Sequence, residues 1–278
     1  MKMGISVWSF PGDWSLKKIF ETAKSSGFDG VEVALAEDGE VNLNTTVEDM
    51  QKVKALAEET GIELYSVASG LYWNYSLTSN NENIRNKAKS IVKKQLEVAS
   101  WLGCDTILVV PGSVGVDFIV NCEIVEYDVA YERAFSAINE LKSIAEELKV
   151  AIGVENVWNK FLLSPIEMKD FIDKADSNFV GSYFDVGNVI YSGYPEHWIK
   201  ILGSRIKKVH FKDFRKSVGT FEGFVDLLSG DVNYPKVMEE LKKAGYDGWV
   251  TAETGIYKDY PEQSVFNTAN SMRRILSV

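Results

Sequence analysis

One hydrophobic pattern recurs along the chain. A helix-like segment ends at a glycine, and then an apolar residue, an acid and a run of apolar residues follow. The pattern occurs at Gly27, Gly61, Gly103 and Gly245. Glycine often follows the last turn of a helix because it adopts the left-handed conformation without steric strain. Each copy therefore predicts a turn from a helix into a strand.

Eight apolar runs are candidate strands, and their apolar content is nearly continuous, as in parallel strands that are buried on both faces. They cover residues 3–8, 30–35, 63–69, 106–111, 150–155, 179–185, 206–211 and 249–253. Helical periodicity lies between them, most clearly over residues 84–102 and 129–148. Thr46 and Ser164 are suitable helix N-caps.

Alternating strands and helices in this number predict one α/β domain over residues 1–278, a (β/α)₈ TIM barrel. A doubly wound open sheet is the alternative. The glycine-rich nucleotide-binding motifs that often accompany an open sheet do not occur in the sequence.

Charge and cysteine content narrow the functional classes. The 278 residues include 30 Lys and Arg against 40 Asp and Glu, a net charge of −10, which disfavours nucleic acid as a partner. Cys104 and Cys122 form no C-x-x-C motif and indicate a reduced, cytoplasmic protein. No run reaches the roughly 18 apolar residues that span a bilayer, so we expect no membrane association. The apolar N-terminus is broken by Pro11 and lacks a cleavage site, so we do not expect a signal peptide.

Ligand-type side chains end four successive predicted strands. They are Glu155, Asp185, His210 and Glu253. In a (β/α)₈ barrel these strand ends meet at the catalytic face. Clustered carboxylates there need a cation or shared protons, and three carboxylates with one imidazole suit a divalent ion such as Mn²⁺, Mg²⁺, Co²⁺ or Zn²⁺. Singly, each residue could equally be a loop cap or a satisfied core residue.

The loops on the same face contain candidates for substrate binding. Tyr72 and Trp73 follow the third strand, in an aromatic loop that could cover a sugar or simply plug the rim. Trp158 and Asn188 follow the fifth and sixth strands. Lys212, Arg215 and Lys216 follow the seventh strand and could bind a phosphate.

Two further ionisable residues, His197 and Glu32, do not lie at strand ends. His197 lies in a predicted helix and is expected to be a surface or packing residue. Glu32 lies inside the second strand, where it could point into the barrel or pair with a lysine, and the sequence assigns it no role.

A family resemblance rests on motifs of the C-terminal half. They are Val154-Glu155-Asn156, Phe184-Asp185-Val186-Gly187-Asn188, Val209-His210-Phe211-Lys212-Asp213, Ser229-Gly230-Asp231-Val232-Asn233-Tyr234, and Ala244-Gly245-Tyr246-Asp247-Gly248-Trp249 with Glu253. In these the chain resembles the xylose isomerase-like barrels, in particular the sugar phosphate isomerases and epimerases that include ketose 3-epimerases and ulose-5-phosphate epimerases.

The resemblance implies one divalent metal ion, with Mn²⁺ favoured, held by Glu155, Asp185, His210 and Glu253. It also implies that Glu155 and Glu253 are the acid and base. Similar ketose 3-epimerases have a histidine where this chain has Asn188 and a further acid after the first glutamate, where this chain reads Val157-Trp158-Asn159. The resemblance therefore does not extend to the way those enzymes bind a free ketohexose.

Together these features predict a metal-dependent isomerase or epimerase that moves a proton through an enediolate of a ketose or ketose phosphate. The net charge favours a free or lightly modified sugar over a phosphorylated one. The main alternative is a dehydratase or lyase acting on a keto-sugar or inosose at the same site. A zinc-dependent apurinic endonuclease and a non-catalytic sugar-binding barrel are less favoured, and a homo-oligomer is possible.

Overall fold

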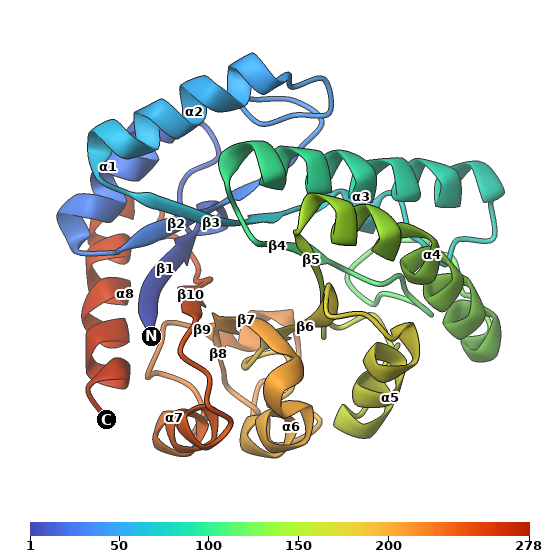
Figure 1. Ribbon diagram of the computed structural model, residues 1–278. Coiled ribbons are helices and arrows are strands. Elements are labelled where there is room, and N and C mark those ends of the chain that lie inside the picture. Colours follow the sequence, from blue (N-terminus) through green and yellow to red (C-terminus); the bar gives the residue numbers. More distant parts are fainter.

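Eight short strands form the centre of the computed structural model, which describes residues 1–278 (Figure 1). The strands are β1 (Lys2–Ser6), β2 (Gly30–Ala34), β3 (Glu63–Ala68), β4 (Thr106–Val109), β5 (Ala151–Glu155), β6 (Val180–Asp185), β7 (Ile206–Phe211) and β10 (Trp249–Ala252). They close into a barrel in the order β1-β10-β7-β6-β5-β4-β3-β2, and every pair is parallel. Because β1 pairs with both β2 and β10, the sheet has no edge. The barrel prediction is confirmed and the open sheet is excluded.

Eight helices surround the strands and follow them along the chain (Figure 1). They are α1 (Leu16–Ser26), α2 (Val47–Thr60), α3 (Glu82–Leu102), α4 (Tyr127–Leu148), α5 (Pro165–Ala175), α6 (Pro195–Leu202), α7 (Tyr234–Lys243) and α8 (Pro261–Leu276). None of them is long and apolar enough to cross a membrane.

The glycines and the Thr46 N-cap predicted from the sequence lie at the ends of helices in the structure. Gly27, Gly61 and Gly103 end α1, α2 and α3 with φ angles of 93°, 70° and 80°, which a residue with a Cβ atom adopts only under strain. The Thr46 side chain accepts a hydrogen bond from the amide of Asp49, and the Asp49 carboxylate accepts one from the amide of Thr46, which is a capping box.

The predicted strands agree with the observed ones except for a few terminal residues. The first strand ends at Ser6 instead of residue 8, because Val7–Ser9 turns into a short 3₁₀ helix, η1. A two-stranded antiparallel hairpin after β7, formed by β8 (Asp213–Phe214) and β9 (Phe224–Val225), was not predicted. This hairpin lies in the loop that leads to α7.

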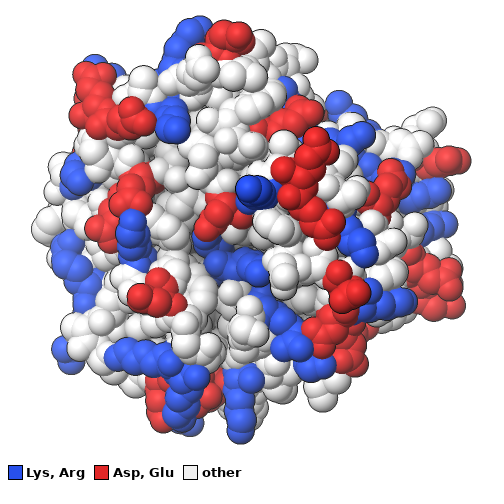
Figure 2. Space-filling view, viewed as in Figure 1, with Lys and Arg blue, Asp and Glu red and all other residues white.

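The alternation of side chains along a strand positions the functional residues. Phe184 in β6 packs on Trp198 of α6, and Phe211 in β7 packs on Tyr234 of α7, with ring centroids 6.1 and 5.1 Å apart. The residues that alternate with them, such as His210, therefore point into the barrel. Over the molecular face in Figure 2, acidic and basic side chains are interspersed, and no large region carries one sign alone.

Candidate metal centre and active site

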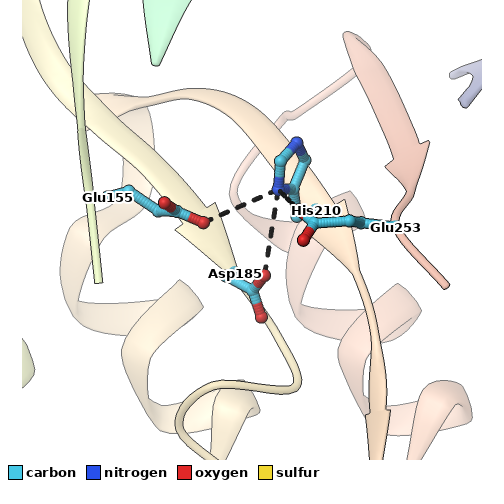
Figure 3. A group of neighbouring side chains, drawn as sticks. All are labelled: Glu155, Asp185, His210 and Glu253. Carbon is cyan, nitrogen blue, oxygen red and sulfur yellow. Dashed lines mark ion pairs between the residues drawn. The ribbon is translucent and has the colours of Figure 1, made fainter. Parts of the chain in front are cut away.

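Four neighbouring strands bring the predicted ligands to one end of the barrel (Figure 3). Glu155 and Asp185 are the last residues of β5 and β6, and Asp185 pairs in register with His210 of β7. Glu253 follows β10, and its amide donates to the carbonyl of Phe211. The four residues span 98 positions of the chain, from Glu155 to Glu253, and barrel closure brings their side chains together.

The imidazole of His210 lies among the three carboxylates. Its Nδ1 atom is 3.0 Å from Glu253 Oε2, 3.6 Å from Glu155 Oε1 and 3.8 Å from Asp185 Oδ2. One possible ligand atom from each residue lies within 4.8 Å of all the others. Glu155 and Glu253 approach the nitrogen from opposite sides in Figure 3.

Three of the atoms that could bind a metal ion at this centre make no hydrogen bond. His210 Nδ1, Asp185 Oδ2 and Glu253 Oε2 are buried, and their close approaches do not have hydrogen-bond alignment. Leaving buried polar atoms unsatisfied costs about 1–3 kcal/mol each, more when they are charged. Ligands about 2.1 Å from a common ion are about 3–4 Å apart, which matches the observed spacing. The residues fit a divalent metal ion.

The second imidazole nitrogen of His210, Nε2, contacts the buried carboxylate of Glu32, a residue to which the sequence assigned no role. Glu32 of β2 points into the barrel, and its Oε1 lies 2.9 Å from His210 Nε2. Its other oxygen accepts hydrogen bonds from Ser66 Oγ, at 2.8 Å, and from the Tyr183 hydroxyl. The position inside an apolar strand was the only signal for this role in the sequence.

Lys212, which follows β7, lies directly over the carboxylates. Its ammonium group lies 2.9 Å from Glu253 Oε1 and 3.1 Å from Asp185 Oδ2, and only 16% of the side chain is exposed. Because the end of β7 directs this side chain back over the carboxylates, Lys212 compensates part of their negative charge. Its role as a substrate-binding residue stays a prediction.

The electrostatic environment separates the two glutamates. Burial raises the pKa of Glu155 to about 7, although His210 and Lys212 oppose the shift. Burial would also raise the pKa of Glu253, but the Lys212 ammonium and His210 outweigh it and hold that pKa at about 2. Two carboxyl groups at one centre thus differ in proton affinity.

Asp185 and Asn188 are connected by a local network. The side chain of Asn156 accepts from the Asp185 amide and donates to its carbonyl, at 2.9 and 2.8 Å. The Asn188 amide donates to Asp185 Oδ1 at 2.8 Å, and its side chain donates to the Asn156 carbonyl at 3.0 Å. The Trp158 indole donates to the Asn188 carbonyl. These bonds fix Asp185 at the barrel mouth.

A cavity of about 320 Å³ opens over the centre. Glu155 and Glu253 line it, together with four of the six predicted substrate-binding residues. Those four are Trp73, Trp158, Asn188 and Lys212.

Two other predicted substrate-binding residues lie elsewhere. Tyr72 is 2% exposed, and its hydroxyl donates to Gln95, which itself donates to two strand carbonyls. Its short 3₁₀ turn, η2 (Leu71–Trp73), directs Tyr72 into the core and Trp73 toward the cavity. Arg215 is exposed outside the cavity and donates to the Ser229 carbonyl at 3.0 Å. Lys216 is exposed beside it, and His197 is exposed on α6, as expected.

A family model described as "Xylose isomerase-like TIM barrel" matches residues 20–275. The chain belongs to this family. Among curated relatives of this xylose isomerase-like barrel, the putative L-ribulose-5-phosphate 3-epimerase SgbU of Escherichia coli is 26% identical over 262 residues, covering 89% of this chain and 86% of that one.

Solved structures share the fold of this family member at low sequence identity. D-psicose 3-epimerase from Clostridium cellulolyticum, determined with D-tagatose, superposes with a TM-score of 0.83, at 19% identity, over 100% of this chain and 99% of that one. The IolI protein with a bound zinc atom has a TM-score of 0.80, at 18% identity, over 100% and 98%.

Proposed function

We propose that this xylose isomerase-like barrel is a divalent-metal-dependent sugar epimerase or isomerase. The observation that carries the proposal is the convergence of three carboxylates on His210 Nδ1 at the floor of the cavity. The relatives named as L-ribulose-5-phosphate 3-epimerases support a sugar epimerase. The zinc atom in the IolI structure supports a metal site in a barrel of this fold.

Glu155, Asp185, His210 and Glu253 would hold the ion, and Mn²⁺ is the metal we favour. A bound divalent ion supplies Lewis-acid stabilisation to the oxygen that gains charge when a proton leaves the carbon next to a carbonyl. Glu32 keeps the imidazole oriented, since its carboxylate fixes Nε2 as the donor and leaves Nδ1 free to bind.

Glu155 and Glu253 would move the proton. One carboxylate takes it from the carbon next to the carbonyl, and the other returns one from the opposite face for epimerisation. Both line the cavity, and they approach from opposite sides of the centre (Figure 3).

The substrate we propose is not phosphorylated. The charged residues that line the cavity are Glu155, Lys212, Asp213 and Glu253, so one cation faces three carboxylates. That cation is already paired with Asp185 and Glu253. Apart from the metal ion, a phosphate dianion would find no unpaired positive charge there, and the three carboxylates would repel it.

The test is a screen of ketoses, keto-sugars and ketose phosphates with the Mn²⁺-loaded protein in D₂O. We expect deuterium to enter the carbon next to the carbonyl, with the epimer as product. Loss of water would instead identify the dehydratase alternative. Absence of exchange with every sugar, in protein that holds the metal, would contradict an epimerase.

The single domain, the cytoplasmic location and the possible homo-oligomer stay predictions from the sequence.

A further inference from the structure

Lys212 contacts two of the residues that could hold a metal ion. Its Nζ atom lies 2.9 Å from Glu253 Oε1 and 3.1 Å from Asp185 Oδ2. Glu253 directs its other oxygen, Oε2, toward His210 Nδ1 at 3.0 Å. The Glu253 carboxylate therefore lies between two positions for positive charge. One is the candidate metal position, and the ammonium group of Lys212 fills the other.

Close packing of the backbone fixes the place from which the Lys212 side chain starts. A Cβ atom on Gly187 would lie 2.5 Å from Lys212 Cβ and 3.0 Å from the Lys212 carbonyl carbon, so a larger residue there would displace the lysine. The buried Tyr234 hydroxyl donates to the Lys212 carbonyl at 2.9 Å. Lys212 is two positions after His210, and both side chains point to the same side. The ammonium group is thus a fixed part of the centre.

No other basic side chain forms an ion pair with the three carboxylate ligands. Their ion pairs involve only His210 and Lys212. Asp213 lines the same cavity, but three backbone amides already donate to its carboxylate. Three carboxylate ligands with one ammonium group leave a formal charge that one divalent ion balances. Without the lysine, the ligands would stay negative after such an ion had bound.

We infer that Lys212 is a positioning residue that acts as a permanent second cation of the centre. It holds Asp185 and Glu253 together when no divalent ion is bound, and its charge weakens the binding of that ion. This inference rests on the metal site of the proposed function. An ammonium group that contacts two ligands lies within several Å of the ion that they hold. Even with the screening of bulk water, this repulsion corresponds to about tenfold in affinity.

A lysine with only a structural role would have the opposite effect on metal binding. If Lys212 did no more than hold the ligands in place, its loss would disorder them and weaken the binding of Mn²⁺. If it is a second cation, loss of its charge strengthens the binding of Mn²⁺ and destabilises the metal-free protein. The direction of the change in affinity separates the two roles.

The experiment measures the dissociation constant for Mn²⁺, by competition with a fluorescent chelator, and the Tm of the metal-free protein. The uncharged variants are Lys212→Met and Lys212→Gln, and the amide of the second can still donate to the carboxylates. Lys212→Arg keeps the charge. The matched control is Lys216→Met, which removes a positive charge from an exposed position of the same loop.

We expect both uncharged variants to bind Mn²⁺ about tenfold or more tightly than the wild type, because the repulsion is removed. Their Tm without metal should be lower, since the carboxylates then repel one another without compensation. Lys212→Arg and Lys216→Met should bind Mn²⁺ no more tightly than the wild type. If Lys212→Met does not fold, the milder Lys212→Gln decides the result.

Equal or weaker binding of Mn²⁺ by folded Lys212→Gln would overturn the inference and leave the metal site standing. Absence of Mn²⁺ binding in both the wild type and Lys212→Gln would contradict the metal site and the inference together. Tighter binding in the uncharged variants, without deuterium exchange of any sugar by the wild type, would support the inference and contradict the proposed epimerase or isomerase.

Discussion

Glu32 and His210 are 178 positions apart in the chain, yet Glu32 Oε1 lies 2.9 Å from His210 Nε2, and both side chains are fully buried. The contact spans the barrel from β2 to β7. It restrains the rotation of the imidazole and directs Nδ1 toward the three carboxylates. Such carboxylate–histidine pairs set both the tautomer and the basicity of a metal ligand.

Replacing Glu32 tests this relationship. Glu32→Gln should weaken Mn²⁺ binding by about 10–100-fold, the usual effect of losing such a partner. The readout is the dissociation constant from competition with a fluorescent chelator. Glu63→Gln is the control, because Glu63 is exposed and paired with Lys2. Unchanged affinity in Glu32→Gln would contradict the role of the Glu32 carboxylate in orienting His210.

Metal should stabilise the fold through the same ligands. At a free Mn²⁺ concentration 100 times the Kd, binding contributes about 2.7 kcal/mol, which raises Tm by several degrees in a chain of this size. His210→Ala should abolish the response. His197→Ala should retain it, since His197 is exposed on α6. An equal Mn²⁺-induced rise in Tm in His210→Ala would exclude His210 as a ligand.

Glu155→Gln and Glu253→Gln separate proton transfer from binding. Each amide keeps the shape of the carboxylate but cannot accept the proton, so kcat for deuterium exchange should fall by about 100-fold or more. KM should change less, provided that metal content, measured by mass spectrometry, is comparable. Wild-type turnover in either variant would remove that residue from the acid–base pair.

Arg215 should have no part in choosing between free and phosphorylated sugars. Its guanidinium group donates to the Ser229 carbonyl outside the cavity. Arg215→Ala should therefore leave the ratio of kcat/KM for matched free and phosphorylated ketoses unchanged. A phosphate contact would instead cost about 1.5–3 kcal/mol, a 10- to 150-fold loss for the phosphorylated substrate. Such a loss would show that the loop after β7 rearranges.

Close packing inside the barrel gives a prediction on stability. A Cβ atom on Gly4 would lie 2.1 Å from the Tyr65 hydroxyl, which is bonded to Thr251, while the Tyr65 ring stacks on Trp249. Gly4→Ala should cost about 1–3 kcal/mol of unfolding free energy, measured by urea denaturation. Gly12→Ala, which would meet no atom within 4 Å, should have little effect. Equal stability of the two variants would contradict tight packing here.

The sequence alone was sufficient to predict the barrel and to select Glu155, Asp185, His210 and Glu253. Helix caps and apolar runs are local signals, and parallel strands in a closed barrel bring their C-terminal ends together. A polar residue at such an end is thus assigned to one face without knowledge of its contacts. This is why the four residues could be chosen from strand ends alone.

Contacts across the barrel were decided only by the tertiary structure. The direction of a side chain depends on strand register and on the turn that follows, and neither is visible in local sequence. Lys212 therefore turned back onto Asp185 and Glu253, Tyr72 turned into the core toward Gln95, and Glu32 met His210. The ring contacts among Trp73, Phe118, Phe221 and Phe224 likewise exist only because barrel closure brings three separate loops together.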